Sequence, residues 1–478
     1  MIIDGPVATQ QLTTHFSPFT TMANKPSIPQ GTRDFSAEDV RKRNYILTTI
    51  KTVFELYGFQ PLETPAMENL ETLMGKYGEE GDKLIFKILN NGLNREEKRE
   101  KTKAAFEKIL EGKSTTDITE KALKYDLTIP FARHVAMNHT KLVFPFRRYQ
   151  VQPVWRGDKP QRGRYREFTQ CDADVVGSYS LMNDVEFALI YDEVFNRLGL
   201  KGYELRINSR KILSALAAAC NASEKLVDIT VAIDKLDKIG IEEVKKELTG
   251  RGLQDEQVSI IEKYISITGT NEEKIMQLNT LIGHVENAVH GIEEIRKILQ
   301  HTAGKNIIVD FTLARGLNYY TGIIYEAKAP ATVSIGSIGG GGRYDDLTGL
   351  FGVPGIPGVG ISFGIDRIYD VLEELKLFPE NVEAGTKVLF FNMGEKESEM
   401  AFTIMQQLRH EGIACELYHQ QESKIAKQFN YAEKKNIPFA VIIGSKEMEQ
   451  QQCQVKNLST GEQQTIAFEK LADFLKNN

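Results

Sequence analysis

Hydrophobic positions change their spacing several times along the chain, and each change predicts a different kind of element. From residue 36 to 57 they recur every three or four residues, which predicts an amphipathic helix with Ser36 as its N-cap. Residues 149–156 and 165–176 show strand patterns and flank the turn-forming stretch 157–163. This part of the chain therefore predicts a hairpin with a long loop.

The middle of the chain is predicted to be mainly helical. Helical spacing dominates residues 210–300, and strand patterns return at 306–312 and 323–329. The glycine-rich stretch 336–342 fits either a flexible turn or a backbone that a small ligand approaches closely. Residues 359–376 predict one further helix. Strands interrupted by a helical block favour an α+β fold for this larger part of the chain.

The end of the chain alternates strand and helix patterns over residues 387–478, which predicts a small α/β domain with a mostly parallel sheet. Residues 378–386 resemble a linker, and residues 1–24 contain no Lys or Arg and predict a disordered extension. The predicted divisions are the extension, the first part of a core, a helical insertion, the second part of the core and the terminal domain: 1–24, 25–204, 205–304, 305–377 and 387–478.

Composition narrows the class of protein without identifying a substrate. The 478 residues carry a net charge of −6, which argues against a surface built throughout for nucleic acid. No apolar run approaches the ~20 residues of a membrane span. Four separated cysteines without a CxxC pair argue against a disulfide scaffold or a zinc ribbon and indicate a reducing, cytoplasmic setting. The sequence contains no metal-ligand, Walker A, HExxH, GxSxG or dinucleotide-binding motif.

Positive charge is concentrated in residues 141–166, which hold eight basic residues and one acid, Asp158. A hairpin loop with this charge suits a polyphosphate or the end of a nucleic acid, with a solvated basic loop as the alternative. On the second strand, alternation places an arginine, an aromatic ring, an amide and two carboxylates on one face: Arg166, Phe168, Gln170, Asp172 and Asp174. Burying such groups unpaired is unfavourable, so this face indicates the floor of a ligand site.

The helix predicted at 359–376 carries an unusual stripe. Gly360, Gly364 and Arg367 would lie on one side of it, where two glycines weaken a helix. Either tight packing or the close approach of a flat ligand would explain them.

The segment 313–322 follows a strand that is predicted to be buried. Its arginine and paired tyrosines, Arg315, Tyr319 and Tyr320, suit the recognition of a carboxylate or phosphate together with a planar ring.

These segments together resemble the histidyl-tRNA synthetase family of class II aminoacyl-tRNA synthetases, over nearly the whole chain from Lys25. The matching segments are PQGTRDF, YGFQPLETPAMENLETL, KYDLTIPFAR, VWRGDKPQRGRYREFTQCDADVVG, LARGLNYYTG, IGGGGRYDDL and GVGISFGIDRI, which begin at residues 29, 57, 124, 154, 313, 338 and 358. The Arg-Gly-Leu-x-Tyr-Tyr pattern is the most specific of them.

The resemblance implies an antiparallel class II catalytic sheet with a helical insertion, followed by an anticodon-binding domain. It implies that L-histidine is activated with ATP to histidyl-adenylate and then transferred to the 3′ end of tRNA(His). Mg²⁺ would accompany the nucleotide, and no metal site of the protein itself is implied. The family likeness also implies a homodimer formed through motif 1 and the helix 36–57.

The resemblance further implies roles for basic residues of the site. Arg156 would clamp the α-phosphate of ATP and Arg367 the γ-phosphate, with Arg164 in support and Gly364 beside the nucleotide. Arg315 would bridge the substrate carboxylate and the α-phosphate as charge builds in the transition state. Arg156, Arg315 and Arg367 are therefore the expected catalytic residues.

For histidine and tRNA the resemblance implies a second set of contacts. The α-amino group would be held by Asp126, Thr128 and Gln170, with Leu127 beside them. The imidazole nitrogens would be read by Asp174, Tyr319 and Tyr320, while Arg156 and Arg315 meet the carboxylate end. On the hairpin loop, Gln161 and Arg162 would meet the tRNA acceptor end. A pocket that hydrogen-bonds both ring nitrogens rejects apolar analogues strongly.

Two departures and two alternatives accompany the resemblance. Asp158 stands where motif 2 usually has Glu, and residues 124–128 differ from the Arg-Pro-Glu-Gly-Thr of many bacterial members. A non-synthetase regulatory paralogue of histidine biosynthesis would lack the terminal domain and the Arg315 signature. A non-catalytic tRNA-binding scaffold would have lost one of the three catalytic arginines. The chain retains all of these features, so both alternatives are disfavoured.

Overall fold

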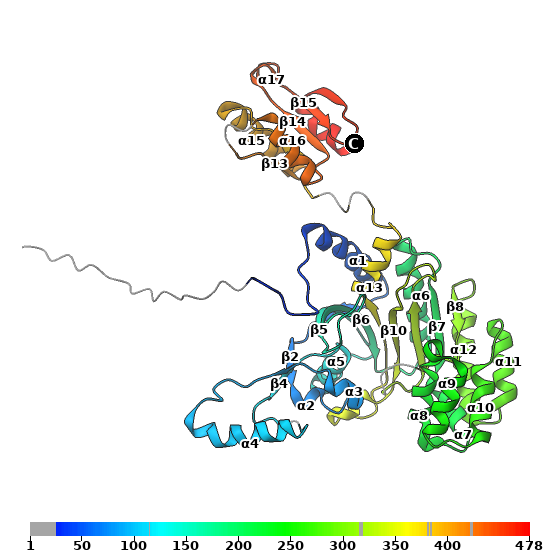
Figure 1. Ribbon diagram of the computed structural model, residues 1–478. Coiled ribbons are helices and arrows are strands. Elements are labelled where there is room, and N and C mark those ends of the chain that lie inside the picture. The colour runs from blue at the N-terminus through cyan, green and yellow to red at the C-terminus, as the bar shows by residue number, and fades with distance from the viewer. Residues whose placement is uncertain (1–24, 114, 315–318, 380–381, 383–384, 421–423) are drawn as a thin grey trace, which may run out of the picture.

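The computed structural model describes residues 25–478, except 114, 315–318, 380–381, 383–384 and 421–423. Eight strands of this part form one sheet (Figure 1), in the order β1 (Gln60–Pro61), β5 (Phe146–Trp155), β6 (Glu167–Val176), β11 (Gly358–Gly364), β10 (Ser337–Tyr344), β9 (Ile323–Lys328), β7 (Glu204–Ser209) and β8 (Ile307–Val309). The outer pairs β1–β5 and β7–β8 are parallel, and the pairs between them are antiparallel.

Three helices cover one face of this sheet: α1 (Ala37–Leu56), α6 (Met182–Arg197) and α13 (Ile365–Glu374). The predicted N-cap of α1, Ser36, is confirmed and forms a capping box: Ser36 Oγ accepts from the Asp39 amide at 3.2 Å, and Asp39 Oδ2 accepts from the Ser36 amide at 2.8 Å. The ring of Phe363 on β11 lies 5.9 Å from that of Phe54 on α1. Alternate residues of the central strands therefore form an apolar core on this side and leave polar side chains on the other.

The predicted helical insertion is confirmed between β7 and β8. It consists of α7 (Arg210–Ala219), α8 (Leu226–Ile233), α9 (Leu236–Gly250), α10 (Asp255–Ile265), α11 (Asn271–Ile282) and α12 (Glu286–His301). The helices α12 and α7 pack against each other, and α12 also contacts β7 and α6, so the insertion shares its core with the sheet (Figure 1).

Between β1 and β5 the chain builds a second, smaller layer. A three-stranded sheet has the order β2 (Met67–Asn69), β4 (Lys121–Leu123) and β3 (Lys87–Ile88). Four helices belong to the same part: α2 (Leu70–Leu73), α3 (Gly78–Lys83), α4 (Arg99–Leu110) and α5 (Thr128–Asn138). The turn from β4 into α5 brings residues 124–128 against the central strands, where they line the cavities described below.

The terminal part has its own sheet and its own buried core. The strand order is β13 (Cys415–Leu417), β12 (Val388–Phe390), β14 (Phe439–Ile442), β15 (Gln452–Asn457) and β16 (Gln463–Ala467). The helices are α15 (Glu395–His410), α16 (Ile425–Lys434), α17 (Ser445–Glu449) and α18 (Leu471–Asn477). The first three strands are parallel as predicted, while β15 and β16 add antiparallel edges.

The helix predicted at 359–376 is wrong in its first part. Gly358–Gly364 is the strand β11, and the helix α13 begins only at Ile365. Val359, Ile361 and Phe363 are buried on the core side. The hydrophobic residues of this segment thus follow the two-residue period of a strand, although their spacing also fitted the 3.6-residue period of a helix. The stripe of Gly360, Gly364 and Arg367 on one helix therefore does not exist.

Tight cross-strand packing explains the glycines of β10 and β11. The flexible-turn alternative for residues 336–342 is wrong, because Ser337–Tyr344 is a central strand. A Cβ at Gly341 would lie 2.2 Å from the Gly360 oxygen, and one at Gly360 would lie 2.0 Å from Asp174 Oδ1. Only glycine leaves room at these positions.

Several sequence expectations lie wholly or partly outside the described residues: the extension 1–24, the Arg315 position and parts of the linker 378–386. All four cysteines are described, and each is buried and free of a disulfide. None of the helices in the described part is both long and apolar enough to cross a bilayer.

A buried ion pair joins β10 to α6. Arg343 Nε donates to Asp184 Oδ1 at 3.3 Å, and the two side chains are 4% and 0% exposed. Burial raises the pKa of Asp184 to about 6, and Arg343 opposes that rise. The pair holds the glycine-rich strand against the helix layer.

We predict that Arg343→Met lowers the free energy of unfolding by about 3–5 kcal/mol, because it leaves a buried carboxylate without its partner. The double variant Asp184→Asn/Arg343→Met should recover part of this loss. Urea denaturation of the three proteins measures the effect. A loss below about 1 kcal/mol for the single variant would show that the ion pair is not needed to hold β10.

Candidate active site

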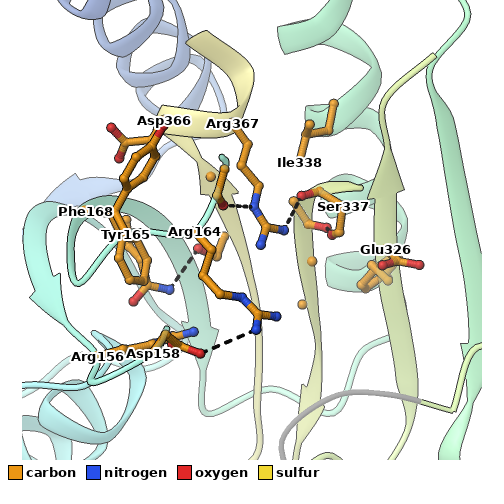
Figure 2. A pocket seen from close by; sticks show the side chains of 18 of the residues that line it. Arg156, Asp158, Arg164, Tyr165, Phe168, Glu326, Ser337, Ile338, Asp366 and Arg367 are labelled. Carbon is orange, nitrogen blue, oxygen red and sulfur yellow. Dashed lines mark hydrogen bonds and ion pairs between the residues drawn. The ribbon is translucent and has the colours of Figure 1, made fainter. Parts of the chain in front are cut away.

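Two adjoining cavities lie over the central strands. The outer cavity has a volume of about 440 Å³ and is lined by the β5–β6 loop, by β6, β9, β10 and β11, and by the first turn of α13 (Figure 2). The inner cavity has a volume of about 60 Å³ and reaches toward α5. Residues common to both linings are Arg156, Gln170, Tyr320, Gly340, Gly341 and Ser362. The cavities therefore form one continuous site with a wide and a narrow part.

Arg156 is fixed where the two cavities meet. Its Nε donates to the Tyr125 carbonyl oxygen at 3.0 Å. The guanidinium carbon lies 4.3 Å from the centre of the Tyr125 ring and 5.1 Å from that of Phe168. Two rings and one carbonyl thus hold a permanent positive charge in a defined place.

Two more predicted arginines, Arg164 and Arg367, line the outer cavity and point into it in Figure 2. Arg367 donates from Nε to the Gly163 oxygen and from Nη1 to the Ser337 oxygen, both at 2.7 Å, and so ties the hairpin loop to β10. Arg164 lies 3.6 Å from Asp158 Oδ1 across the loop. The structure therefore brings Arg156 and Arg164 of the hairpin together with the distant Arg367, as a site for a polyphosphate requires.

A carboxylate clamp at Asp366, a residue for which no role was predicted, supports this arrangement. Asp366 forms ion pairs with Arg33 and with Arg43, the latter at 2.5 Å, and accepts from the Thr169 amide at 3.2 Å. Arg33 also lies 3.4 Å from the centre of the Tyr165 ring. The clamp joins the N-terminal segment, the hairpin and α13, which places Arg367. The PQGTRDF segment, which contains Arg33, indicated a role for this arginine in the sequence, but its partner Asp366 is 333 residues away.

Of the polar face predicted for the second strand, Gln170, Asp172 and Asp174 line the inner cavity, and Phe168 lines the outer one. Cross-strand rows run from β5 through β6 to β11: Arg148–Asp174–Gly360, Gln150–Asp172–Ser362 and Gln152–Gln170–Gly364. Roles for Arg148 and Ser362 were not predicted, because cross-strand register is not a local property of the sequence. Arg166 precedes β6 and does not belong to either cavity lining.

Asp174 is a buried anion with strong partners. Arg148 Nη2 lies 2.7 Å from Asp174 Oδ2, and the Tyr344 hydroxyl donates to Oδ1. The Arg148 guanidinium also lies 4.1 Å from the centre of the Phe131 ring. Burial raises the pKa of Asp174, while Arg148 and Tyr344 oppose the rise.

Asp126 forms the opposite wall of the inner cavity. Its Oδ1 accepts from the Tyr77 hydroxyl at 2.9 Å and from the Ile129 amide at 3.1 Å. Thr128, at the start of α5, lines the same wall and hydrogen-bonds to Tyr319. The neighbouring Leu127 is fully buried and lines neither cavity.

The paired tyrosines close the inner cavity from the side of β9. The rings of Tyr319 and Tyr320 lie 5.0 Å apart with their planes at 66°, so one edge meets the other face. Both line the inner cavity, as predicted for residues that would contact a planar ring. Arg315 lies outside the described residues.

Other predicted residues lie near the site without lining it. Arg162 pairs with Glu374 on α13 at 2.6 Å, and Gln161 exchanges backbone hydrogen bonds with Arg164. Both residues belong to the hairpin loop and precede Gly163 and Arg164, which line the outer cavity. Gly364 does line the outer cavity, beside Arg367.

The side chains of the outer cavity that could contact a metal ion are separate carboxylates. Among the residues that the structure describes, no cluster of three or more His, Cys, Asp or Glu side chains is arranged to hold a metal ion. Asp158, Glu326 and Asp366 line the outer cavity, and Asp366 is held by two arginines. This set fits a cation that arrives on a polyphosphate better than a resident metal centre.

Comparison with known proteins gives a consistent result. The family model described as histidyl-tRNA synthetase matches residues 106–368, and the model described as anticodon binding domain matches residues 387–478. The histidine–tRNA ligase of Flavobacterium johnsoniae is 52% identical over 470 residues, which cover 94% of this chain and 99% of the relative. That of Christiangramia forsetii is 53% identical over 460 residues, which cover 95% of this chain and all of the relative.

Solved structures agree with these matches. A histidyl-tRNA synthetase from Nostoc sp. PCC 7120 superposes with a TM-score of 0.79 at 32% identity and covers 95% of this chain and 99% of its own. A Bacillus halodurans C protein described as an ATP phosphoribosyltransferase regulatory subunit/histidyl-tRNA synthetase gives a TM-score of 0.66 at 20% identity, covering 87% of this chain and 97% of its own. At that identity, the second likeness concerns the fold alone.

Asp172 should make the stability of the fold depend on pH. Burial raises its pKa from an ordinary 3.8 to about 7, while Arg148 opposes the rise. The folded state then binds more protons than the unfolded state between about pH 4 and pH 7, so this group reduces stability as pH increases through that range. Asp172→Asn should remove the effect.

We predict that Asp172→Asn raises stability relative to the unsubstituted chain by about 1–2 kcal/mol at pH 5 and by about 3–5 kcal/mol at pH 8, since one pKa unit corresponds to about 1.4 kcal/mol. Urea denaturation at the two pH values measures the difference. A difference independent of pH would contradict the raised pKa.

Proposed function

Because the chain belongs to the histidyl-tRNA synthetase family, we propose how its two cavities divide the substrates of histidine–tRNA ligation. The chain is a histidine–tRNA ligase, which activates L-histidine with ATP to histidyl-adenylate and transfers it to the 3′ end of tRNA(His). One observation carries the division: Arg156 lines both cavities, at the place where a bound amino acid and a bound nucleotide would meet. The regulatory paralogue is not favoured, since relatives about half identical over nearly the whole chain are ligases.

The inner cavity takes histidine. Its carboxylates and amide suit an ammonium group, which Asp126, Thr128 and Gln170 would hold. Asp174 and Tyr320, with Tyr319 beside them, would read the imidazole nitrogens. An apolar side chain of similar size would leave these buried groups unpaired and would therefore be rejected.

The outer cavity takes ATP. Arg164 and Arg367 would meet the distal phosphates and Arg156 the α-phosphate, while Phe168 offers the flat apolar surface that a purine ring needs. Gly364 would leave room beside the nucleotide. Arg315, outside the described residues, is assigned to the carboxylate and the α-phosphate on the resemblance of its segment alone.

Adenylate formation then follows from the position of Arg156. A carboxylate oxygen of histidine attacks the α-phosphorus of ATP, and the bond to pyrophosphate breaks. Negative charge builds on the α-phosphate oxygens in this transition state, where the fixed guanidinium stabilises it without reorganising. In the second step a ribose hydroxyl of the tRNA attacks the activated carbonyl and AMP leaves. Neither step needs an enzyme nucleophile.

Mg²⁺ would arrive bound to the phosphates of ATP. Asp158 and Glu326, two carboxylates that line the outer cavity, would help to hold it, in keeping with the preference of Mg²⁺ for one or two carboxylates, phosphate oxygens and water. When bound, the ion supplies charge neutralisation along the triphosphate.

The remaining parts of the chain would serve tRNA and assembly. Gln161 and Arg162 on the hairpin loop would meet the acceptor end, and residues 387–478 would bind the anticodon. We propose the divisions 1–24, 25–204, 205–304, 305–377 and 387–478, in which the helices of the insertion begin at Arg210, after the sheet strand β7. A homodimer through motif 1 and α1 is proposed because apolar side chains of this region, Val40, Leu56 and Met67, are exposed. Charging tRNA would place the protein in the cytoplasm.

We predict histidine-dependent ATP–pyrophosphate exchange by the purified chain, which Arg156→Ala should slow by about 10²–10³-fold because a charge at the developing anion is lost. Arg197→Ala, on the exposed side of α6 and paired with Glu193, is the matched control and should keep full activity. Exchange that does not require histidine, or that survives Arg156→Ala, would contradict the proposed site.

We also predict that a chain ending near residue 384 keeps the exchange activity but charges tRNA(His) at least about tenfold more slowly, which corresponds to about 1.4 kcal/mol of lost tRNA binding. The terminal part has its own core, so its removal leaves the core of the catalytic sheet intact. Parallel assays of exchange and charging measure the two steps. Equal loss of both activities would argue that the terminal part belongs to the catalytic fold.

A further inference from the structure

Three buried oxygen atoms of the inner cavity have neither a hydrogen-bond donor nor an ion-pair partner among the residues that the structure describes. They are Asp126 Oδ2, Gln170 Oε1 and Asp172 Oδ1, and all three residues line that one cavity. A buried acceptor without a donor is unfavourable, so three of them around one small space indicate a ligand group that brings several N–H bonds. An ammonium group has three.

We propose that Asp172 is a further histidine-binding residue, whose Oδ1 accepts a hydrogen bond from the α-ammonium group beside Asp126 and Gln170. The inference rests on the proposed placement of histidine in the inner cavity and adds a contact to it.

Ser362 sets the direction of two of these acceptors. Gln170 Nε2 donates to Ser362 Oγ at 3.2 Å, and the Ser362 side chain hydrogen-bonds to Asp172. A hydroxyl that accepts from the amide can still donate to the carboxylate. The amide nitrogen and one carboxylate oxygen are thereby turned toward β11, which leaves Gln170 Oε1 and Asp172 Oδ1 for the cavity. Both residues lie on β6, two positions apart and on one face.

The charges around Asp172 favour a cationic ligand. Arg148 lies on the neighbouring strand, but its ion pair within 4 Å is with Asp174, at 2.7 Å. In the described part of the chain no cation forms an ion pair with Asp172, which is 3% exposed. Burial accordingly raises its pKa, and an arriving ammonium group would supply the missing positive charge.

Two compounds separate the ammonium contact from every other role. Histidinol keeps the imidazole and the ammonium group but lacks the carboxylate, whereas imidazolepropionate keeps the imidazole and the carboxylate but lacks the ammonium group. Inhibition constants for both are measured against histidine in the exchange assay, with the unsubstituted chain and with Asp172→Asn.

We expect Asp172→Asn to raise the inhibition constant of histidinol about 10–100-fold, the range for a lost hydrogen bond to a charged group. The inhibition constant of imidazolepropionate should rise less than threefold. The KM for histidine should rise while the KM for ATP stays within twofold. Asp192→Asn is the matched control, because Asp192 is a buried carboxylate bonded to Tyr203 and Lys305. It should leave the ratio of the two inhibition constants unchanged.

The proposal would be overturned if Asp172→Asn raised both inhibition constants equally or changed neither, since Asp172 would then contact the imidazole or serve only the fold. A structure of the histidine complex provides a second measurement, in which the ammonium nitrogen must lie within hydrogen-bond distance of Asp172. If the unsubstituted chain bound neither histidine nor the two compounds, the proposed function itself would fail. Failure of the Asp172 contact alone would leave histidine binding intact.

Discussion

The buried ion pair between Arg148 and Asp174 is the constraint around which the catalytic sheet is arranged. A buried charge is tolerated only when a partner and hydrogen bonds compensate it, so neighbouring positions must adapt. Gly360 leaves room for the carboxylate, Tyr344 donates to it, and Phe131 lies beside the guanidinium. The opposite face of the same strands is apolar and packs on helices. One sheet therefore separates a core from a polar binding floor.

The parts of this fold that depend on local patterns were predictable. The capped helix α1, the basic hairpin and the helical insertion follow from spacing within a few turns of chain, and alternation along β6 placed its polar residues on one face. The candidate site was also predictable in outline, because Arg156, Gln170 and Asp174 come from one continuous hairpin and meet at the inner cavity.

The parts of the fold that depend on pairing between distant segments could not be predicted from the sequence. The seven residues of β11 fit both a strand and a helix period, and only the neighbouring strands decide between them. The glycines of β10 look like a turn until the close approach of β11 is known. The contacts of Arg148 with Asp174 and of Ser362 with Asp172 depend on cross-strand register. Overall charge was equally uninformative, since a net charge of −6 averages over one concentrated basic stretch.

The clamp at Asp366 has a consequence for how the protein folds during its synthesis on the ribosome. Arg33 and Arg43 leave the ribosome among the first residues of the described chain, whereas their shared carboxylate is made 333 and 323 residues later. Until α13 emerges, the hairpin lacks its anchor and Arg367 is absent. The nucleotide pocket therefore cannot be assembled in stages during synthesis, and a nascent chain acquires its ATP site only when the catalytic part is almost complete.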